Sequence, residues 1–106
     1  MLARTWYTEI DPDRAEEYER FAREISLPMF RAQQGFAGVL MVRDGTQCRV
    51  ITLWHGPEDI TALETSPTYQ HTVARIIGAG FLRGDQRVEV MDAHLFASDL
   101  NSEVAR

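Results

Sequence analysis

The sequence predicts an α+β domain with a ferredoxin-like βαββαβ order and a four-stranded antiparallel sheet. The clearest observation is a hairpin, in which an Asp-Gly dipeptide separates two apolar runs. Helical segments with apolar residues three or four positions apart precede and follow this hairpin. A further strand-like run lies at each end of this set. The order of elements is therefore strand, helix, strand, strand, helix, strand.

The first strand and the first helix are predicted within residues 2–35. Residues 2–10 alternate between two faces as a strand does. Asp11 suits an N-cap and Pro12 suits the first helical position, so a helix is expected to begin there. Pro28 is expected to end or kink this helix, and a short further helical turn closes at Gly35. The apolar stripe of the helix consists of Ala15, Tyr18, Phe21, Ala22 and Ile25.

The hairpin comprises residues 36–42 and 47–55. If Asp44 and Gly45 form a two-residue turn, Arg43 pairs with Thr46 and the register is determined. One face then carries Phe36, Leu40, Val42, Arg49, Ile51 and Leu53. The other face carries Val39, Met41, Cys48, Val50 and Trp54, with Trp54 opposite Gly35.

Both faces of this hairpin are apolar, whereas a hairpin with one solvated face shows polar alternation. The helices of a domain this small can cover one face only. We therefore expect a second copy of the chain to cover the other face, which makes the protein a homodimer. The pattern leaves open which face meets the helices, and so whether Trp54 or His55, on opposite faces, lines a pocket.

The second half of the chain is expected to contain two helical segments and the last strand. Gly56-Pro57 is expected to open one helix and Ser66-Pro67 a longer one, which Gly78-Ala79-Gly80 ends. Residues 87–96 are predicted to form the strand, with Val88, Val90 and Phe96 on one face. A single domain of residues 1–96 and a polar tail of residues 97–106 follow from this division.

Composition and charge argue against several classes of protein. The net charge of −5 and the scattered basic residues argue against a nucleic-acid partner. No apolar stretch approaches the ~18 residues that a membrane span requires, and the N-terminus lacks the layout of a signal peptide. Cys48 is the single cysteine of the 106 residues, which excludes an intramolecular disulfide. A cytoplasmic location is expected.

Three motifs in order resemble the antibiotic biosynthesis monooxygenase family. They are Gln34-Gly35-Phe36-Ala37-Gly38 at the start of the second strand, Trp54 followed by Gly56-Pro57-Glu58-Asp59, and Ser66-Pro67-Thr68-Tyr69 at the start of the long helix. The resemblance covers residues 3–96. It implies a dimeric α/β barrel, in which two four-stranded sheets face each other and a pocket lies between each sheet and its own helices.

The resemblance also implies a choice of functions. Some members are cofactor-free monooxygenases that oxidise phenolic anthrones or quinols with O₂, some degrade haem, and others have no known activity. We therefore expect either a monooxygenase acting on a small aromatic phenol, anthrone or quinol without metal or flavin, or a non-catalytic dimeric domain that binds a small aromatic ligand. Val50 and Ile60 stand where the aromatic oxygenases have Asn and Tyr, which favours the second interpretation. Leu63 and Val73 replace the Trp and the ligating His of the haem-degrading members, which argues against haem degradation.

Arg49, His55 and Tyr69 are the candidate catalytic residues. Arg49 lies mid-strand among apolar residues, so its guanidinium requires an acceptor. That acceptor is either the carboxylate of Glu9, Glu89 or Asp92, or the oxyanion of a substrate. His55 or Tyr69 would move the phenolic proton; alternatively, His55 is a half-exposed strand-end residue and Tyr69 a core aromatic.

The candidate substrate-binding residues are mostly apolar. Trp54 would pack against the substrate ring, or else is a large apolar plug at the strand end. Met29 and Phe30 would form the lip of the pocket, and Tyr7 or its neighbour Trp6 would face it. His71 is expected to point to solvent and His94 to lie in the barrel or the interface, and the spacing of the histidines indicates no metal site.

Overall fold

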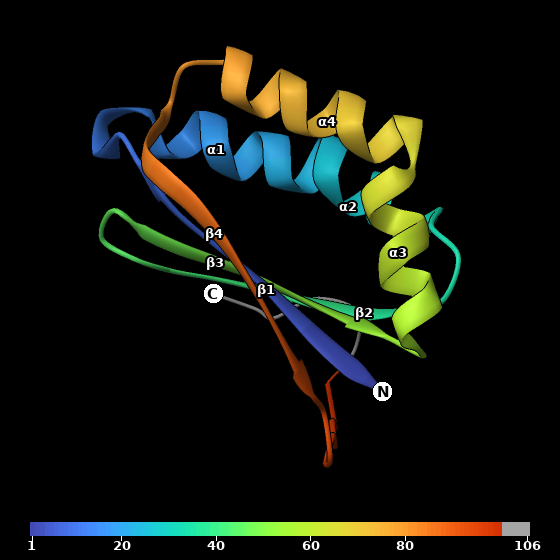
Figure 1. Cartoon of the computed structure of the whole chain (residues 1–106). Helices are drawn as coiled ribbons and strands as arrows, with labels where there is room; N and C mark the ends of the chain where they lie inside the picture. The colour runs from blue at the N-terminus through green and yellow to red at the C-terminus, as the bar shows by residue number, and fades with distance from the viewer. Residues whose placement is uncertain (101–106) are drawn as a thin grey trace.

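The computed structural model describes residues 1–100, so residues 101–106 of the predicted polar tail lie outside the described residues. One antiparallel sheet has the strand order β2-β3-β1-β4, and helices lie over one of its faces (Figure 1). The strands are β1 (Leu2–Ile10), β2 (Phe36–Asp44), β3 (Gln47–Trp54) and β4 (Leu82–Asp92). The predicted α+β class and βαββαβ order are confirmed.

The first helical segment is continuous from Pro12 to Arg31 but changes its winding. It comprises η1 (Pro12–Arg14), α1 (Ala15–Phe21), the π-helical turn η2 (Ala22–Ser26) and α2 (Leu27–Arg31). Asp11 caps it as expected, because its Oδ1 accepts a hydrogen bond from the N–H of Asp13 at 3.0 Å. Pro28 does not end the helix. The irregularity is the π turn just before it, where the N–H of Leu27 reaches back to the carbonyl of Ala22.

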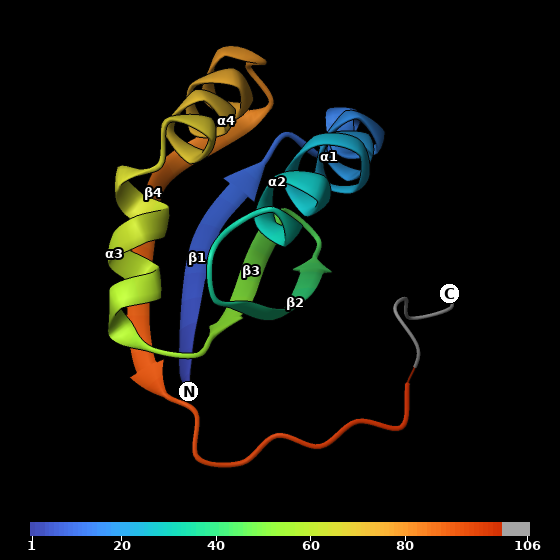
Figure 2. The same ribbon diagram turned by 90° about the vertical axis from the view of Figure 1, so that its right-hand side faces the viewer.

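The second helical segment consists of α3 (Pro57–Thr65) and α4 (Pro67–Gly78), separated by Ser66 in an extended conformation. Helix α3 leads away from the end of β3, and α4 lies beside α1 and α2 over the sheet (Figures 1 and 2). Among the described residues, no helix is long and apolar enough to cross a membrane.

The predicted turn of the hairpin is wrong by one residue. Asp44 pairs with Gln47, so Gly45 and Thr46 are the two turn residues. A type I′ turn requires positive φ at both central residues. Here φ is +61° at Gly45, and no residue other than glycine has positive φ among those described, so the turn fits type II′. Arg43 pairs with Cys48 instead of Thr46, and this shift by two residues preserves the predicted faces.

The start of β2 departs from the predicted register. A bulge between Phe36 and Gly38 makes Phe36, not Gly35, the partner of Trp54. The bulge also turns the Phe36 side chain to the same face as Trp54, where the two rings meet edge to face at 5.8 Å between centroids. The prediction that Phe36 shares a face with Leu40 is therefore wrong, because the extra residue breaks the alternation.

Strand β4 begins five residues earlier and ends four residues earlier than the predicted 87–96. Among residues 1–100, its only hydrogen-bonded neighbour is β1, and Leu82 pairs with Ile10 while Asp92 pairs with Leu2. The length of β1 therefore sets the limits of β4. Phe96 lies beyond the strand with 66% of its surface exposed.

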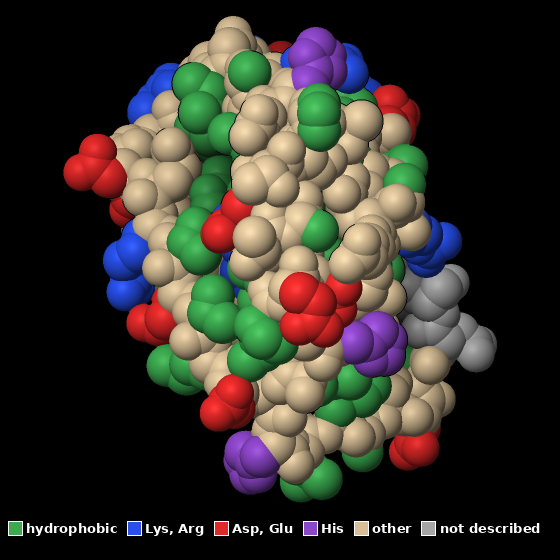
Figure 3. All heavy atoms as spheres, turned by 45° about the vertical axis from the view of Figure 1, so that its right-hand side comes forward, with side chains coloured by type: hydrophobic (Ala, Val, Ile, Leu, Met, Phe, Trp, Pro, Cys, Tyr) green, Lys and Arg blue, Asp and Glu red, His purple; other side chains and the backbone are tan. Residues whose placement is uncertain are grey.

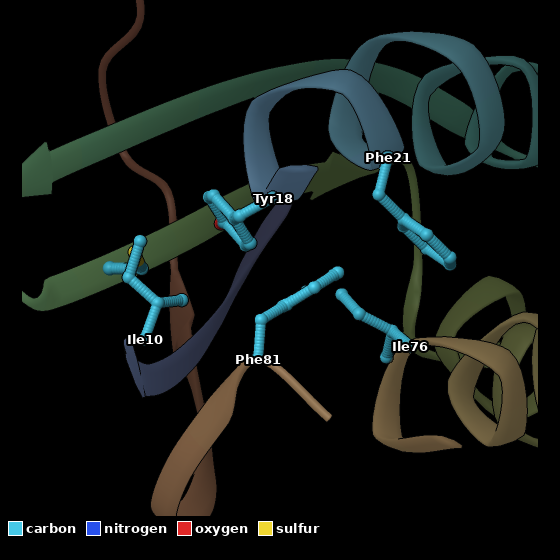
Figure 4. Packing of buried hydrophobic residues seen from close by; sticks show 6 residues of the cluster. Ile10, Tyr18, Phe21, Ile76 and Phe81 are labelled. Carbon is cyan, nitrogen blue, oxygen red and sulfur yellow. The ribbon is translucent and has the colours of Figure 1, made fainter. Parts of the chain in front are cut away.

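The face of the sheet that meets the helices carries the buried side chains of β3. These are Cys48, Val50, Thr52 and Trp54, all below 8% exposed. One end of the core gathers around Phe81, whose ring meets the rings of Tyr18 and Phe21 edge to face, each at 6.1 Å (Figure 4). We call this face the inner face. The opposite, outer face has no helix over it (Figure 1) and leaves Leu40, Val42 and Met91 exposed by 49%, 42% and 60%.

Candidate functional site

A cavity of about 50 Å³ lies between the inner face of the sheet and the helices above it. Its wall is made by β1, β2 and β3 below and by α1, η2, α2 and α4 above. Most of this wall is apolar, from Trp6, Ala22, Met29, Phe30, Met41, Val50, Val73 and Ile76. The predicted pocket between the sheet and its own helices is therefore present in this chain.

Six polar side chains also line the cavity: Arg4, Tyr18, Ser26, Thr52, Tyr69 and Thr72. None of the fourteen lining residues is an aspartate, a glutamate or a histidine. The wall thus carries one formal positive charge and no group that is a strong base at neutral pH.

Of the described residues, Arg4 is the one charged residue in the wall, and it is 5% exposed. Its Nη2 donates to the hydroxyl of Tyr69 at 3.0 Å. Its Nε and Nη2 both lie 3.3 Å from Oε2 of Glu64, whose side chain is 48% exposed. Glu64 is at the end of α3 and Tyr69 at the start of α4, so Arg4 ties the corner between these helices to the central strand β1.

The Tyr69 hydroxyl accepts this bond from Arg4, which leaves its own proton available to a ligand oxygen. The Arg4 guanidinium has a free donor as well, since no hydrogen bond among the described residues uses its Nη1. The pair therefore presents N–H and O–H donors at one end of an apolar cavity. Donors in such a setting stabilise an oxyanion more strongly than they would in water.

Two other groups of this region cannot act as bases or nucleophiles near neutral pH. Burial raises the pKa of Tyr18 well above its ordinary value, so its hydroxyl stays protonated. Burial likewise raises the pKa of the Cys48 thiol, although the hydrogen bond with Tyr18 opposes that rise. Cys48 remains a thiol packed in the core rather than a thiolate.

Three of the predicted site residues line the cavity. Tyr69, Met29 and Phe30 are all in its wall, and the rings of Phe30 and Tyr69 lie 6.5 Å apart. Trp54 is on the inner face but fully buried beside the cavity, not in its wall. Its indole N–H donates to Oγ1 of Thr52 at 2.7 Å, and Thr52 does line the cavity.

Arg49 and Tyr7 lie on the outer face, away from the cavity. They pair with each other across β1 and β3, and the guanidinium of Arg49 lies 4.5 Å from the centroid of the Tyr7 ring. Arg87 contacts the same ring at 3.9 Å, and Glu89 accepts the hydrogen bond of the Tyr7 hydroxyl at 3.2 Å. The acceptor of Arg49 is the carbonyl of Cys48 at 3.3 Å, rather than the expected carboxylate of Glu9, Glu89 or Asp92.

His55 is exposed at the end of β3, outside the cavity wall. His71 is exposed on α4 as expected, and His94 is exposed after the end of β4 rather than within a strand. The histidine side chains seen in Figure 3 lie well apart. Within residues 1–100, no group of three His, Cys, Asp or Glu side chains is placed to hold a metal ion.

The corner that follows His55 is closed by Asp59, which is 6% exposed. Its carboxylate accepts the N–H of Gly56 and the Nε2 of Gln34, each at 3.0 Å. This cap explains why the Gly-Pro-Glu-Asp stretch begins a helix at this point. The corner is therefore a structural joint between β3 and α3.

Arg4 is the functional candidate that the analysis of the sequence missed. A signal for it exists, because alternation places Arg4 on the same strand face as Leu2 and Trp6, among apolar residues. No local pattern indicates Glu64, which is 60 residues away and looks like an ordinary solvated helix residue.

Solved structures share this fold at low sequence identity. A protein named antibiotic biosynthesis monooxygenase has a TM-score of 0.71 at 19% identity, over 88% of this chain and 98% of its own. An asparagine-to-alanine variant of SnoaB, a cofactor-independent oxygenase from Streptomyces nogalater, has a TM-score of 0.71 at 14% identity, over 90% and 94%. NE2512, a protein of unknown function from Nitrosomonas europaea, has a TM-score of 0.75 at 16% identity, over 94% and 95%.

No family model matches the sequence, and no curated protein matches it either. At the identities of these solved structures, the likeness extends to the fold and not to the chemistry. The ordered motifs and the three-dimensional comparison nevertheless agree. This chain has the fold of the antibiotic biosynthesis monooxygenases.

Proposed function

We propose that this protein is a cofactor-independent monooxygenase that oxidises a small aromatic phenol, anthrone or quinol with O₂. One observation carries the proposal: a buried Arg4 guanidinium beside the Tyr69 hydroxyl, in the wall of a mostly apolar cavity. The structural likeness to SnoaB, a cofactor-independent oxygenase, supports the reaction class.

The chemistry needs no reductant beyond the substrate. When a ring CH₂ of an anthrone becomes a carbonyl, one atom of O₂ enters the product and the other leaves as water. The substrate supplies all four electrons, and its two hydrogens end in that water. Loss of a proton first converts the substrate into an electron-rich phenolate or enolate. Arg4 and Tyr69 would stabilise its oxyanion, and the apolar walls would exclude water.

The size of the cavity favours a small substrate. Its volume of about 50 Å³ is far below the roughly 300–1,000 Å³ of a typical drug-binding pocket. A compound with one aromatic ring requires the least movement of Met29 and Phe30, which form part of the wall. We therefore place single-ring phenols and quinols ahead of three-ring anthrones.

Oxygen uptake with a panel of phenols, quinols and anthrones tests the proposal. We expect Arg4→Met to reduce kcat/KM about 100-fold or more, and Tyr69→Phe to reduce it less, because Arg4 remains. Arg75→Met is the matched control, since Arg75 is exposed on α4 outside the cavity wall.

Arg49→Met distinguishes Arg4 from Arg49, the catalytic candidate expected from the sequence. If Arg49→Met removes oxygen uptake and Arg4→Met leaves it intact, the reacting centre is on the outer face and the assignment to the cavity is wrong. Uptake at background level with every compound would refute the monooxygenase itself.

The alternative is a non-catalytic domain that binds a small aromatic ligand. The absence of any carboxylate or imidazole among the lining residues favours it, because proton removal from a phenol then lacks an evident base. A ligand that copurifies with the protein, together with no oxygen uptake, would support this alternative.

We further propose that the protein is a homodimer in which two outer faces meet. The exposed Leu40 and Val42 on β2 and Met91 on β4 support this, because the chain's own helices leave these apolar side chains uncovered. Arg49 and Tyr7 would then lie at the interface. The cytoplasmic location expected from the sequence stays a prediction.

A further inference from the structure

We infer that Glu64 is a specificity-determining residue, which makes the cavity select neutral oxygen-bearing rings over permanent anions. The inference deepens the proposed function and rests on the same cavity. Glu64 does not line that cavity; it acts through Arg4, whose guanidinium it contacts from the solvent side.

The first step is the charge of the site. Arg4 alone would make the cavity a site for anions, since it is the only formal charge in the wall. Glu64 compensates this charge, with Oε2 3.3 Å from both Nε and Nη2 of Arg4. A carboxylate ligand entering the cavity would lose its hydration and would lie close to a second carboxylate. A phenol or a ketone carries no charge to desolvate and can still accept hydrogen bonds from Arg4 and Tyr69.

The second step is the difference in solvent exposure between Arg4 and Glu64. Arg4 is 5% exposed, whereas the Glu64 side chain is 48% exposed. In Glu64→Gln, an amide replaces the exposed carboxylate, and the buried Arg4 guanidinium loses its counter-ion. Arg4 would keep its bond to Tyr69, so the shape of the cavity is retained while its charge changes.

Calorimetric titration with benzamide and benzoate at pH 7 tests this inference, because the two rings have nearly the same shape and differ in charge. We expect the wild-type protein to bind benzamide more tightly than benzoate. In Glu64→Gln, the ratio of the two affinities should shift toward benzoate by about fivefold or more. Glu58→Gln is the matched control, since Glu58 is exposed on the same helix and makes no contact with Arg4.

Three outcomes would overturn the inference: tighter binding of benzoate by the wild-type protein, an unchanged ratio in Glu64→Gln, or no binding of either compound. Circular dichroism of the variants confirms that they are folded before titration. Oxygen uptake is measured separately. If the selectivity holds and no compound supports uptake, the monooxygenase fails while the role of Glu64 stands.

Discussion

The lack of a side chain at Gly35 lets three elements come close together. Its φ of +74° favours glycine, and a Cβ at this position would lie 2.0 Å from Cγ of Asp59. The carbonyl of Gly35 also accepts the N–H of His55 at 3.1 Å. The start of β2, the end of β3 and the cap of α3 therefore meet around one glycine.

We expect Gly35→Ala to lower the free energy of unfolding by about 3 kcal/mol or more, from the positive φ and the clash together. Gly45→Ala is the control, because its φ is +61° but a Cβ there would meet nothing within 4 Å. That change should cost about 1 kcal/mol. Urea unfolding of both variants measures the difference, and equal losses would contradict the role of Asp59.

Among the helices and strands, capping residues predicted where each helix begins. The limits of β4 depend instead on its pairing with a strand distant in sequence. Asp11, Gly56 and Ser66 precede the predicted helix starts, and each helix begins there because a cap is a local hydrogen bond. The limits of β4 were wrong because they depend on β1, about eighty residues away in sequence.

Ser66 is the cap that positions Tyr69. Its Oγ accepts the N–H of Tyr69 at 3.4 Å at the start of α4. We expect Ser66→Ala to lower the free energy of unfolding by about 1 kcal/mol and to weaken benzamide binding. Ser98→Ala is the control, since Ser98 accepts the N–H of Leu100 but caps no helix. Equal, negligible losses in urea unfolding would show that the cap contributes nothing.

In the molecule as a whole, the two faces of the sheet differ in how far they are covered. Most of the inner face is buried under the helices, although Val88 and Val90 on β4 are 42% and 45% exposed. The outer face has no helix over it and carries both exposed apolar and charged side chains. The sequence predicted both apolar faces of the hairpin. It did not show that Trp54 and Val50 belong to the inner face and Arg49 to the outer face.

Replacing one of two exposed aliphatic residues of equal size with glutamate tests the proposed dimer. Leu40 on the outer face is 49% exposed and Ile77 on α4 is 52% exposed, so they are matched in exposure and differ in location. We expect Leu40→Glu to convert the dimer into a monomer, because two carboxylates would be buried at the interface. Ile77→Glu should leave the dimer intact. Sedimentation velocity measures both, and a monomeric wild-type protein would refute the proposal.

The order of elements, the caps and the two apolar sheet faces could all be predicted from the sequence. These features depend on residues a few positions apart, and alternation or capping records them directly. Which face meets the helices became clear in the three-dimensional structure, because alternation separates two faces without orienting them. The same structure revealed the candidate site, since Arg4 contacts Glu64 and Tyr69 from 60 and 65 residues away. Contacts at such separations arise when β1 packs beneath the corner of α3 and α4, and no local pattern records that packing.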